Sequence, residues 1–583
     1  MPRKSSNYAP VDIPTNVSVS NGYVYYNLTS EWVSGKSDPS KKRAEHKKRL
    51  IGKSVLGNGD WKKDRRMIPN DAYFQLFEKD KLPEPPVRAD NISVGVYAAI
   101  QKLAESSGLS SILADVFGEE PAQLILDLAM YMIMQESAVF QHFPHWGRNH
   151  AVFSESVRSD SFICTFQKDS LSLSKINEFK KLWARKAIDD GKLFFCYDST
   201  NVNSQAEGVF LVQKGHAKDD PSLDQVNTDY VVRQRDGLPV TFTTFPGSVV
   251  DMAEASEMIE FFGKLVDKET KVSITMICDR GYISEDNVVE MDKAKVGFLL
   301  MLRKNMGITQ DLIAKNASSV RSSAYYIPDL DQFGKTVPGK LFDGDTKTRY
   351  FHIIWDPVLE AKHRKKLFTD LAAKEKALEK AIDRKTRFTE DELKKYKAWF
   401  DLETETTDPI NVKMRGRGSG KEKEAPTYII KAAVKNHMRI DQDEKQCGYY
   451  VLVTSRPMTV PKVLEAYSKR DCVEKVFMAL KSFLGMKKIG VDSDDSIHAK
   501  ALIWFIAAIL HSLIFNKTSG LRVNDRKSFT VPAIIDLLEE ITADKNLTTG
   551  KYERRYKPIK KQNSILNALQ ISVKDIDSCI ADL

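Results

Sequence analysis

Short apolar runs alternate with helical patterns between residues 191 and 305, and they constrain the fold of this chain most strongly. The runs at 192–197 and 273–278 have the length and composition of buried strands. Further strands are expected at 209–212, 230–233, 238–245 and 297–303, and helices at 254–267 and 284–295. This order of strands, then helix, strand, helix and strand, predicts a mixed α/β layer fold.

An aspartate follows each of the two strongest apolar runs. Asp198 follows the run at 192–197, and Asp279 follows the run at 273–278. A carboxylate at the exposed end of a buried strand is held rigidly at the sheet edge, where sites form. A single aspartate of this kind is more often a turn or cap residue. The pair therefore needs a third partner before it indicates a site.

A helix predicted at 461–484 supplies a third carboxylate. At about 100° per residue, Tyr467, Arg470, Glu474 and Lys481 fall within a wedge of about 60° on one helix face. Apolar residues cluster on the adjacent face, so the helix can pack on a sheet beside this polar strip. The alternative is a solvated charged face in which Arg470 and Glu474 form an ordinary i,i+4 pair.

The spacing Tyr467-x2-Arg470-x3-Glu474-x6-Lys481 resembles the signature of one large branch of bacterial insertion-sequence transposases of the DDE type. Members of that branch carry one aspartate after the first core strand, a second followed by arginine, and then this glutamate helix. The segments 215–225 and 245–251 also resemble family segments, although residue 248 is serine where many relatives have asparagine. The resemblance extends loosely from about residue 20 to residue 515.

The resemblance implies an α/β, RNase H-like (integrase-like) mixed-sheet core that an insertion interrupts before the last catalytic helix. The catalytic and metal-binding residues would be Asp198, Asp279 and Glu474. Two Mg²⁺ ions would be the cofactor, with Mn²⁺ as a substitute. Oxygen ligands suit magnesium, and three clustered carboxylates repel one another without a cation.

The resemblance also implies an activity and its partners. The protein would bind the ends of its insertion sequence, cleave them and join the 3′ ends to target DNA, as a homodimer on double-stranded DNA. The candidate DNA-binding residues in the core are Tyr467, Arg470, Lys481 and Arg280. Arginine can bind phosphate bidentately and lysine as a point charge.

We expect six segments along the chain. They are a small basic N-terminal module at 1–90, a helical domain at 91–190, the first part of the core at 191–305, an insertion at 306–446, the last part of the core at 447–520 and a helical C-terminal region at 521–583. Within the insertion, residues 358–399 favour long exposed helix and residues 412–425 favour a linker. The corresponding insertion of relatives is largely β-structured.

The N-terminal module is strongly basic, in a chain of net charge +9. Its cluster includes Lys47, Lys48 and Arg49, and like charges this dense favour contact with DNA phosphate. A solvated basic face is the alternative. The helices at 91–190 could share the binding of DNA ends.

Cellular location is predicted from apolar runs and cysteines. The longest apolar run, 501–515, contains His511 and is shorter than the ~18–20 residues of a membrane span, so we expect a buried core helix and no membrane. Six scattered cysteines suit buried free thiols in a reducing cytoplasm. The resemblance adds a bacterial, nucleoid-associated location.

Two other functions stay open from the sequence. Another RNase H-like nuclease is one, although the Tyr-Arg-Glu-Lys helix and the long insertion argue against it. A domesticated DNA-binding protein without activity is the other, and the three intact carboxylates argue against that.

Overall fold

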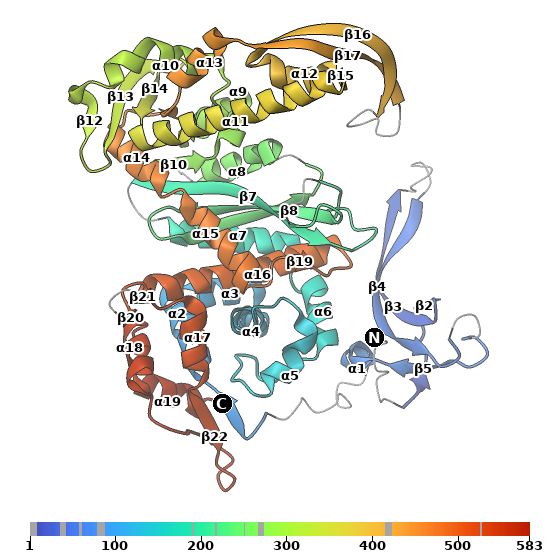
Figure 1. The fold of residues 1–583 in the computed structure, drawn as a ribbon. Coiled ribbons are helices and arrows are strands. Elements are labelled where there is room, and N and C mark those ends of the chain that lie inside the picture. The colour runs from blue at the N-terminus through green and yellow to red at the C-terminus, as the bar shows by residue number, and fades with distance from the viewer. Residues whose placement is uncertain are drawn as a thin grey trace.

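In the computed structural model, the protein is built around one large mixed sheet (Figure 1). The structure describes residues 9–34, 42–57, 61–77, 88–188, 192–215, 219–249, 251–265, 273–413, 422–524 and 527–583. The sheet has the strand order β12-β13-β14-β18-β11-β10-β7-β8-β9, and β19 pairs with β7. Its strands are β7 Lys192–Ser204, β8 Asp224–Arg233, β9 Leu238–Pro246, β10 Ser273–Cys278, β11 Gly297–Met301, β12 Tyr326–Ile327, β13 Gln332–Gly339, β14 Arg349–Trp355, β18 Tyr449–Thr454 and β19 Lys488–Ile489.

Half of this sheet has the topology of an RNase H-like core. β7, β8 and β9 form an antiparallel meander, and β10 and β11 continue the sheet parallel to β7. The order β9-β8-β7-β10-β11 is that of the RNase H-like fold, so the predicted fold class is confirmed. The strand expected at 209–212 is wrong, because the Val212 N–H bonds to the carbonyl of Val209 in a turn and the Leu211 N–H bonds to the side chain of Asp494.

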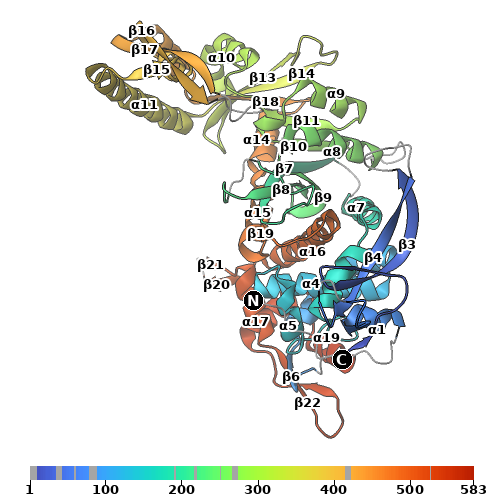
Figure 2. The same ribbon diagram turned by 90° about the vertical axis from the view of Figure 1, so that its right-hand side faces the viewer.

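Helices cover both faces of the core sheet (Figure 2). On one face lie α8 (Asp251–Leu265) and α9 (Glu285–Lys293), where Phe195 of β7 contacts Phe262 with ring centroids 5.2 Å apart. On the other lie α7 (Leu173–Ala187), α15 (Asp471–Phe483) and α16 (Asp494–Thr518). There Phe505 of α16 packs on Phe242 of β9 at 4.8 Å. Side chains alternate across a strand, so residues 196 and 198 of β7 face α15 and residues 195 and 197 face α8.

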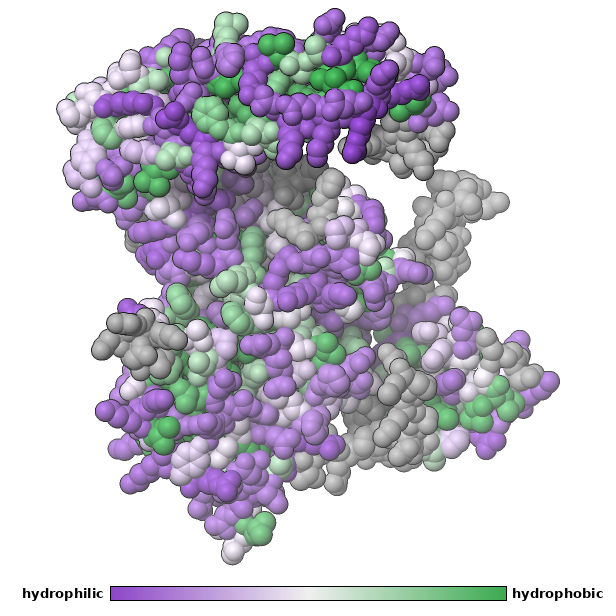
Figure 3. Space-filling view, in the orientation of Figure 1, coloured by the Kyte–Doolittle hydropathy of each residue, from purple (hydrophilic) through white to green (hydrophobic). Residues whose placement is uncertain are grey.

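The expectation of a buried core helix at 501–515 is confirmed by α16. This helix is long and apolar enough to cross a membrane by composition alone, but 72% of its most apolar window is buried inside the protein. It packs against β9 and the helices around it rather than presenting an apolar surface. On the face of the molecule drawn in Figure 3, hydrophilic residues predominate and hydrophobic ones form small separate patches.

The insertion both extends the sheet and builds a unit of its own. The insertion begins with α10 (Gly307–Val320). β14 then pairs with β18 from Tyr350↔Thr454 to Trp355↔Tyr449, and β13 and β12 extend the sheet beyond β14. Beyond β14 come α11 Pro357–Asp383, β15 Arg387–Thr389, α12 Glu390–Lys397, β16 Phe400–Lys413, β17 Glu422–Lys435 and α13 His437–Lys445. They enclose a separate apolar cluster that includes Leu378, Leu393 and Ile430.

Two expectations for the insertion need revision. Long helix is present at 357–383, but the predicted linker at 412–425 lies partly in strands. Lys413 of β16 pairs with Glu422 of β17, and Ile410 pairs with Ala425. Backbone pairing between the two strands overrides their low apolar content, and residues 414–421 lie outside the described part of the chain.

The helical part below the sheet is built from two distant stretches of the chain. The first contributes α2 Gly95–Ser107, α3 Leu109–Phe117, α4 Glu119–Gln135, α5 Phe143–Gly147, α6 Asp160–Asp169 and α7. The second contributes α17 Val531–Glu539, α18 Lys560–Ala568 and α19 Val573–Ala581. The small sheet β23-β22-β6 joins them, pairing β6 (Asn91–Ser93) with β22 (Thr542–Lys545), next to β23 (Tyr552–Arg554). The C-terminal region is therefore not purely helical, since it also contains the short pair β20 (Arg522–Asn524) and β21 (Lys527–Ser528).

The N-terminal part forms a small antiparallel sheet of order β1-β5-β4-β3-β2, set apart from the insertion (Figures 1 and 2). Its elements are β1 Val11–Asp12, β2 Val17–Ser20, β3 Tyr23–Ser34, β4 Lys42–Ser54, β5 Arg66–Pro69 and α1 Asp71–Phe77. Val24, Ile51 and Met67 are fully buried in a cluster of its own. This part therefore has a core distinct from that of the main body.

Candidate active site

Asp198 lies in the middle of β7, not at the strand end that its sequence suggested. β10 pairs with β7 only as far as Cys278↔Tyr197, while β7 continues to Ser204 beside β8. The side chain of Asp198 accepts a 2.9 Å hydrogen bond from the backbone N–H of Ser199. The carboxylate therefore sits where the parallel neighbour ends, on the face that α15 covers.

Asp279 follows β10 directly and caps the short 3₁₀ helix η3 (Arg280–Tyr282). Its Oδ1 accepts from the backbone N–H of Arg280 at 2.8 Å, and its side chain is 43% exposed. Arg303, just after β11, braces the turn by donating to the carbonyls of Arg280 at 2.9 Å and Gly281 at 3.1 Å. Because β7, β10 and β11 are parallel, Asp279 and Arg303 lie at the same edge of the sheet.

The helix expected at 461–484 is broken at Lys469 and Arg470, which corrects the single face predicted for its four polar residues. α14 (Val460–Ser468) ends before the break and α15 begins after it. The N–H groups of Arg470 and Cys472 bond three residues back, to Tyr467 and Lys469, at 3.0 and 3.2 Å. The thiol of Cys196 on β7 lies 4.0 Å from the carbonyl of Lys469, so the break rests on the strand that carries Asp198.

The break places the guanidinium of Arg470 beside two of the three predicted carboxylates. Its Nη2 lies 2.9 Å from Glu474 Oε1, and its Nη1 lies 3.8 Å from Asp279 Oδ1. Burial lowers the pKa of Arg470, but Tyr467 and the charges of Asp279, Glu474 and Asp198 raise it above its usual value overall. Glu474 of α15 and Asp279 of the turn after β10 thus approach one cation, and Asp198 of β7 lies on the sheet face that α15 covers.

The donor chemistry of this cluster fits a divalent metal ion that prefers oxygen. Asp279 and Glu474 are 43% and 55% exposed, so solvent and ions reach them. Within the described ranges, no three His, Cys, Asp or Glu side chains lie close enough to hold a metal as they stand. Arg470 instead neutralises part of the negative charge of these carboxylates. A metal ion could bind here only if the guanidinium moved away from them.

Tyr467 and Lys481 lie on either side of this cluster. The Tyr467 ring is 5.8 Å from the Arg470 guanidinium, and burial raises the pKa of its phenol to about 12, so it keeps its proton. Lys481 lies 2.7 Å from Asp219, in a segment that resembles the family pattern at 215–225. Arg280 is exposed at the start of η3.

The two segments that resemble the family outside the carboxylates have a packing role. A Cβ on Gly215 would lie 2.1 Å from the carbonyl oxygen of Gly247, and a Cβ on Gly247 would lie 2.1 Å from that of Gln225. Gln225 Nε2 also donates to the Gly247 carbonyl at 3.0 Å. Only glycine permits these approaches, which hold the loop that carries Asp219 against the sheet.

The N-terminal basic residues lie far from this cluster in the chain and on a different sheet. Lys48 is exposed on β4, while Arg49 Nε lies 3.9 Å from Asp169 of α6. The side chain of Lys47 lies outside the described part of the structure.

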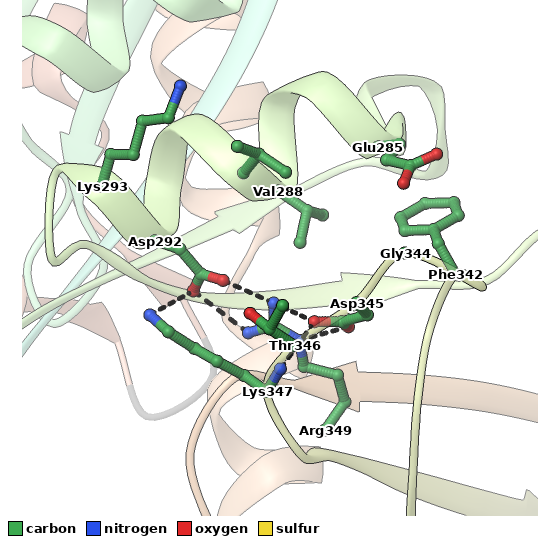
Figure 4. A pocket seen from close by; sticks show the side chains of 11 residues that line it. Glu285, Val288, Asp292, Lys293, Phe342, Gly344, Asp345, Thr346, Lys347 and Arg349 are labelled. Carbon is green, nitrogen blue, oxygen red and sulfur yellow. Dashed lines mark hydrogen bonds and ion pairs between the residues drawn. The ribbon is translucent and has the colours of Figure 1, made fainter.

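A cavity of about 350 Å³ lies between α9 and the β13–β14 connection, and none of the predicted site residues lines it (Figure 4). Arg349 is 1% exposed and donates to Asp345 at 2.7 Å and to Asp292 at 2.6 Å. Lys347 also lies 3.1 Å from Asp292. These pairs tie the extended part of the sheet to α9, so we assign the cluster a structural role.

Sequence reasoning missed two features beside the carboxylates. Arg303 could have been found, because it follows the third parallel strand as Asp279 follows the second. The buried thiols Cys196 and Cys278 gave no signal, although both lie behind the site. Hydrogen bonding to Cys472 and burial raise the pKa of Cys196, and burial raises that of Cys278. All six cysteines are free, but Cys164 is exposed, contrary to the expectation of buried thiols.

Comparison with known families decides the relationship. The family model described as "Transposase DDE domain" matches residues 189–510, more than half of the chain. The chain belongs to this DDE transposase family. The matched range of this transposase begins just before β7 and ends within α16, so it contains Asp198, Asp279 and Glu474 together with the insertion.

Other comparisons are weaker. No curated protein matches this transposase. Among solved structures, a cryo-EM structure of the piggyBac transposase synaptic complex with hairpin DNA matches at a TM-score of 0.32 and 10% identity. That match covers 80% of this chain and 74% of the other. Likeness at this level does not establish a shared fold, so the fold class of this transposase rests on its strand order.

Proposed function

We propose that this DDE transposase binds the ends of its insertion sequence, cleaves them by metal-dependent phosphodiester hydrolysis and joins the 3′ ends to target DNA. Asp198, Asp279 and Glu474 would hold two Mg²⁺ ions, or Mn²⁺ in their place. The observation that carries the proposal is that Glu474 and Asp279, from two separate elements, approach the single guanidinium of Arg470 beside the strand that carries Asp198. Clustered carboxylates repel one another unless a cation neutralises them, and a divalent metal could take that role from Arg470.

The chemistry needs an activated oxygen nucleophile and neutralised phosphate charge, both of which paired divalent ions supply when bound. The chain's own residues would position the DNA. Arg470 can bind a phosphate with two parallel N–H groups once it leaves the carboxylates. Tyr467 keeps its proton at neutral pH, so its hydroxyl can donate a hydrogen bond to a phosphate oxygen. Lys481 would add a point charge along α15.

Double-stranded DNA is the proposed partner, as element end and as target. Arg280, Lys47, Lys48 and Arg49 are further proposed contacts, and Arg49 would have to leave Asp169 to reach DNA. The N-terminal sheet and the helices between residues 91 and 190 would share the recognition of ends. Two ends must meet for transposition, which favours a homodimer on DNA. A cytoplasmic, bacterial and nucleoid-associated location would follow from this activity.

The decisive test uses DNA that carries the ends flanking the gene, with Mg²⁺ or with EDTA. We expect cleavage at the element boundary that requires metal and is lost by more than about a thousandfold in Glu474→Gln, with end binding retained. Glu465→Gln is the matched control, because Glu465 is exposed on α14 and forms an exposed i,i+4 pair with Lys469. It should cleave normally.

Other outcomes would contradict the proposal in distinct ways. End binding without cleavage by the unaltered protein would favour a domesticated DNA-binding protein. Metal-dependent cutting without preference for ends would favour a general RNase H-like nuclease. Loss of binding together with cleavage in Glu474→Gln would argue against its role as a metal ligand.

A further inference from the structure

The first turns of α11 carry a concentration of positive charge that the proposed chemistry does not use. Residues 362–366 are Lys-His-Arg-Lys-Lys, with no acidic residue between 361 and 369. All of these except His363 are exposed. Farther along the same helix, residues 374–383 alternate three lysines with three acidic residues. The excess charge is therefore confined to one end of α11, which solubility alone does not require.

This basic end of α11 is attached to the edge of the sheet that carries the candidate active site. Lys304 lies just beyond the end of β11, and its Nζ is 3.3 Å from Nδ1 of His363. The neighbouring residue Arg303 braces the turn after Asp279. In Figure 2, α11 projects from the sheet toward the left, the side on which α14 and α15 are also drawn. Positive charge therefore continues from the candidate site onto the insertion.

The nearby carboxylates pair with groups other than the lysines at this end of α11. Glu360 binds Arg321 at 3.3 Å and the indole of Trp355 at 3.0 Å. Asp443 accepts from the indole of Trp399 at 2.6 Å. Arg364 is paired, at 2.5 Å from Glu444. Within the described residues, no ion pair engages the ammonium groups of Lys304, Lys362, Lys365 and Lys366.

The surroundings of His363 also carry more positive than negative charge. Its pKa is lowered first by burial and then by the positive charges of Lys304, Lys362 and Lys366. Asp356 opposes that effect only as the smallest contribution. Three ammonium groups thus lie near one neutral imidazole, and an anion beside them would relieve their repulsion.

We propose that Lys304, Lys362, Lys365 and Lys366 form a surface that binds the phosphate backbone of duplex DNA, and that its occupant is target DNA. Lysine contacts phosphate as a point charge and carries no sequence information. Such a surface suits a target of variable sequence better than an element end, which must be recognised by its bases. The assignment of the duplex as target rests on the proposed transposase function, whereas the backbone-binding surface does not.

The test compares two matched pairs of exposed lysines on the same helix in the full-length protein. Lys362→Ala/Lys366→Ala removes the basic end, and Lys376→Ala/Lys380→Ala is the control with the same i,i+4 spacing. Fluorescence anisotropy would follow binding to a duplex of arbitrary sequence over a range of salt concentrations. The first variant should bind about tenfold more weakly, with the salt slope reduced by about 2, and the control should be unchanged.

Reactions on DNA then identify the occupant. Cleavage of element ends should be unaffected in Lys362→Ala/Lys366→Ala, while joining of pre-cleaved ends to target should fall in proportion to binding. Equal losses of DNA binding in both variants, or an unchanged salt slope, would overturn the proposal that these lysines bind DNA. A loss confined to end-bearing duplex would overturn its assignment to target DNA. Failure of the unaltered protein to cleave ends would instead refute the proposed function, and binding to arbitrary duplex would still test the surface.

Discussion

Arg470 is the residue on which the candidate site is organised in this structure. Its guanidinium contacts Glu474 and lies close to Asp279, although these carboxylates come from different elements. A cation held by the protein itself stabilises an acidic cluster that would otherwise repel itself. The same guanidinium is the proposed phosphate ligand, so metal binding and phosphate binding should be linked through Arg470.

We expect Arg470 to compete with divalent metal in the absence of DNA. Partly exposed ion pairs contribute about 0.2–1 kcal/mol each, so removing two of them should tighten metal binding about two- to thirtyfold. Titration of Mn²⁺ by electron paramagnetic resonance would compare Arg470→Gln with the unaltered protein and with the control Arg470→Lys, which keeps a positive charge. Unchanged or weaker Mn²⁺ binding in Arg470→Gln would show that the guanidinium does not obstruct the metal site.

At the residue scale, the sequence singled out the carboxylates at this edge of the sheet but not the break in the helix before Glu474. Asp198 and Asp279 could be found because each follows an apolar run, and Glu474 because of its spacing from Tyr467, Arg470 and Lys481. The break at Lys469 and Arg470 could not be found, since neither proline nor glycine marks it. It depends on contact with Cys196 of a strand more than 270 residues earlier.

At the scale of elements, the sheet is held by polar contacts as well as apolar ones. His352 of β14 is fully buried between Thr336 of β13 and Thr454 of β18, at 2.8 and 3.0 Å. Thr454 donates its own hydroxyl to the carbonyl of Arg456, so it accepts from the Nε2–H of a neutral His352. Burial lowers the pKa of His352 to about 4.

This burial makes stability depend on pH with a defined sign. The unfolded state, with an ordinary histidine pKa near 6.5, binds more protons than the folded state between about pH 4 and 6.5. The contribution of neutral, buried His352 to the free energy of unfolding is therefore complete above about pH 6.5. It is lost as the pH falls toward 4, by about 3 kcal/mol at most. Denaturant unfolding of His352→Gln should lack this slope. His511 and Asp127 also titrate in this range, but they are common to both proteins, so parallel curves would contradict the prediction.

Elements with an apolar pattern in their own sequence could be predicted. Elements that form only by pairing with a distant strand could not. The core strands and α8 and α9 follow local apolar patterns, and α16 follows a long apolar run, so their type and approximate bounds could be predicted. The extension of the sheet by β12, β13 and β14 depends on pairing with β18, about 100 residues away, which no local pattern indicates. The strands β16 and β17 were hidden in the same way, because their charged composition favours a linker unless each supplies the other's hydrogen bonds.

At the scale of the whole molecule, the described residues fold around three separate apolar clusters. The N-terminal sheet has one, the outer part of the insertion has another, and the core sheet shares the third with the helices on either side of it in the sequence. The C-terminal residues belong to the shared cluster, where Leu538, Ile541 and Ile565 are fully buried. A Cβ on Gly95 would lie 2.1 Å from the carbonyl oxygen of Leu538, which shows how closely α2 and α17 pack.

The outer insertion should therefore be removable, whereas the C-terminal residues should not. β14 and β18 already form an antiparallel pair that ends at Trp355↔Tyr449, and Asp356 N–H bonds to the carbonyl of Gly448 at 3.0 Å. A short glycine-containing turn in place of residues 357–447 would close this hairpin, since the excised part carries its own core. We expect a folded protein whose melting temperature falls by only a few degrees.

The matched control is a chain ending at residue 520, which would expose the apolar face that α17 covers and should aggregate. Far-ultraviolet circular dichroism and thermal melting would compare the two deletions. The excised protein should also bind arbitrary duplex DNA more weakly, because it lacks the basic end of α11 while keeping all three carboxylates. Unfolding of the excised protein would mean that contacts such as Arg321 with Glu360 join the two cores into one cooperative unit.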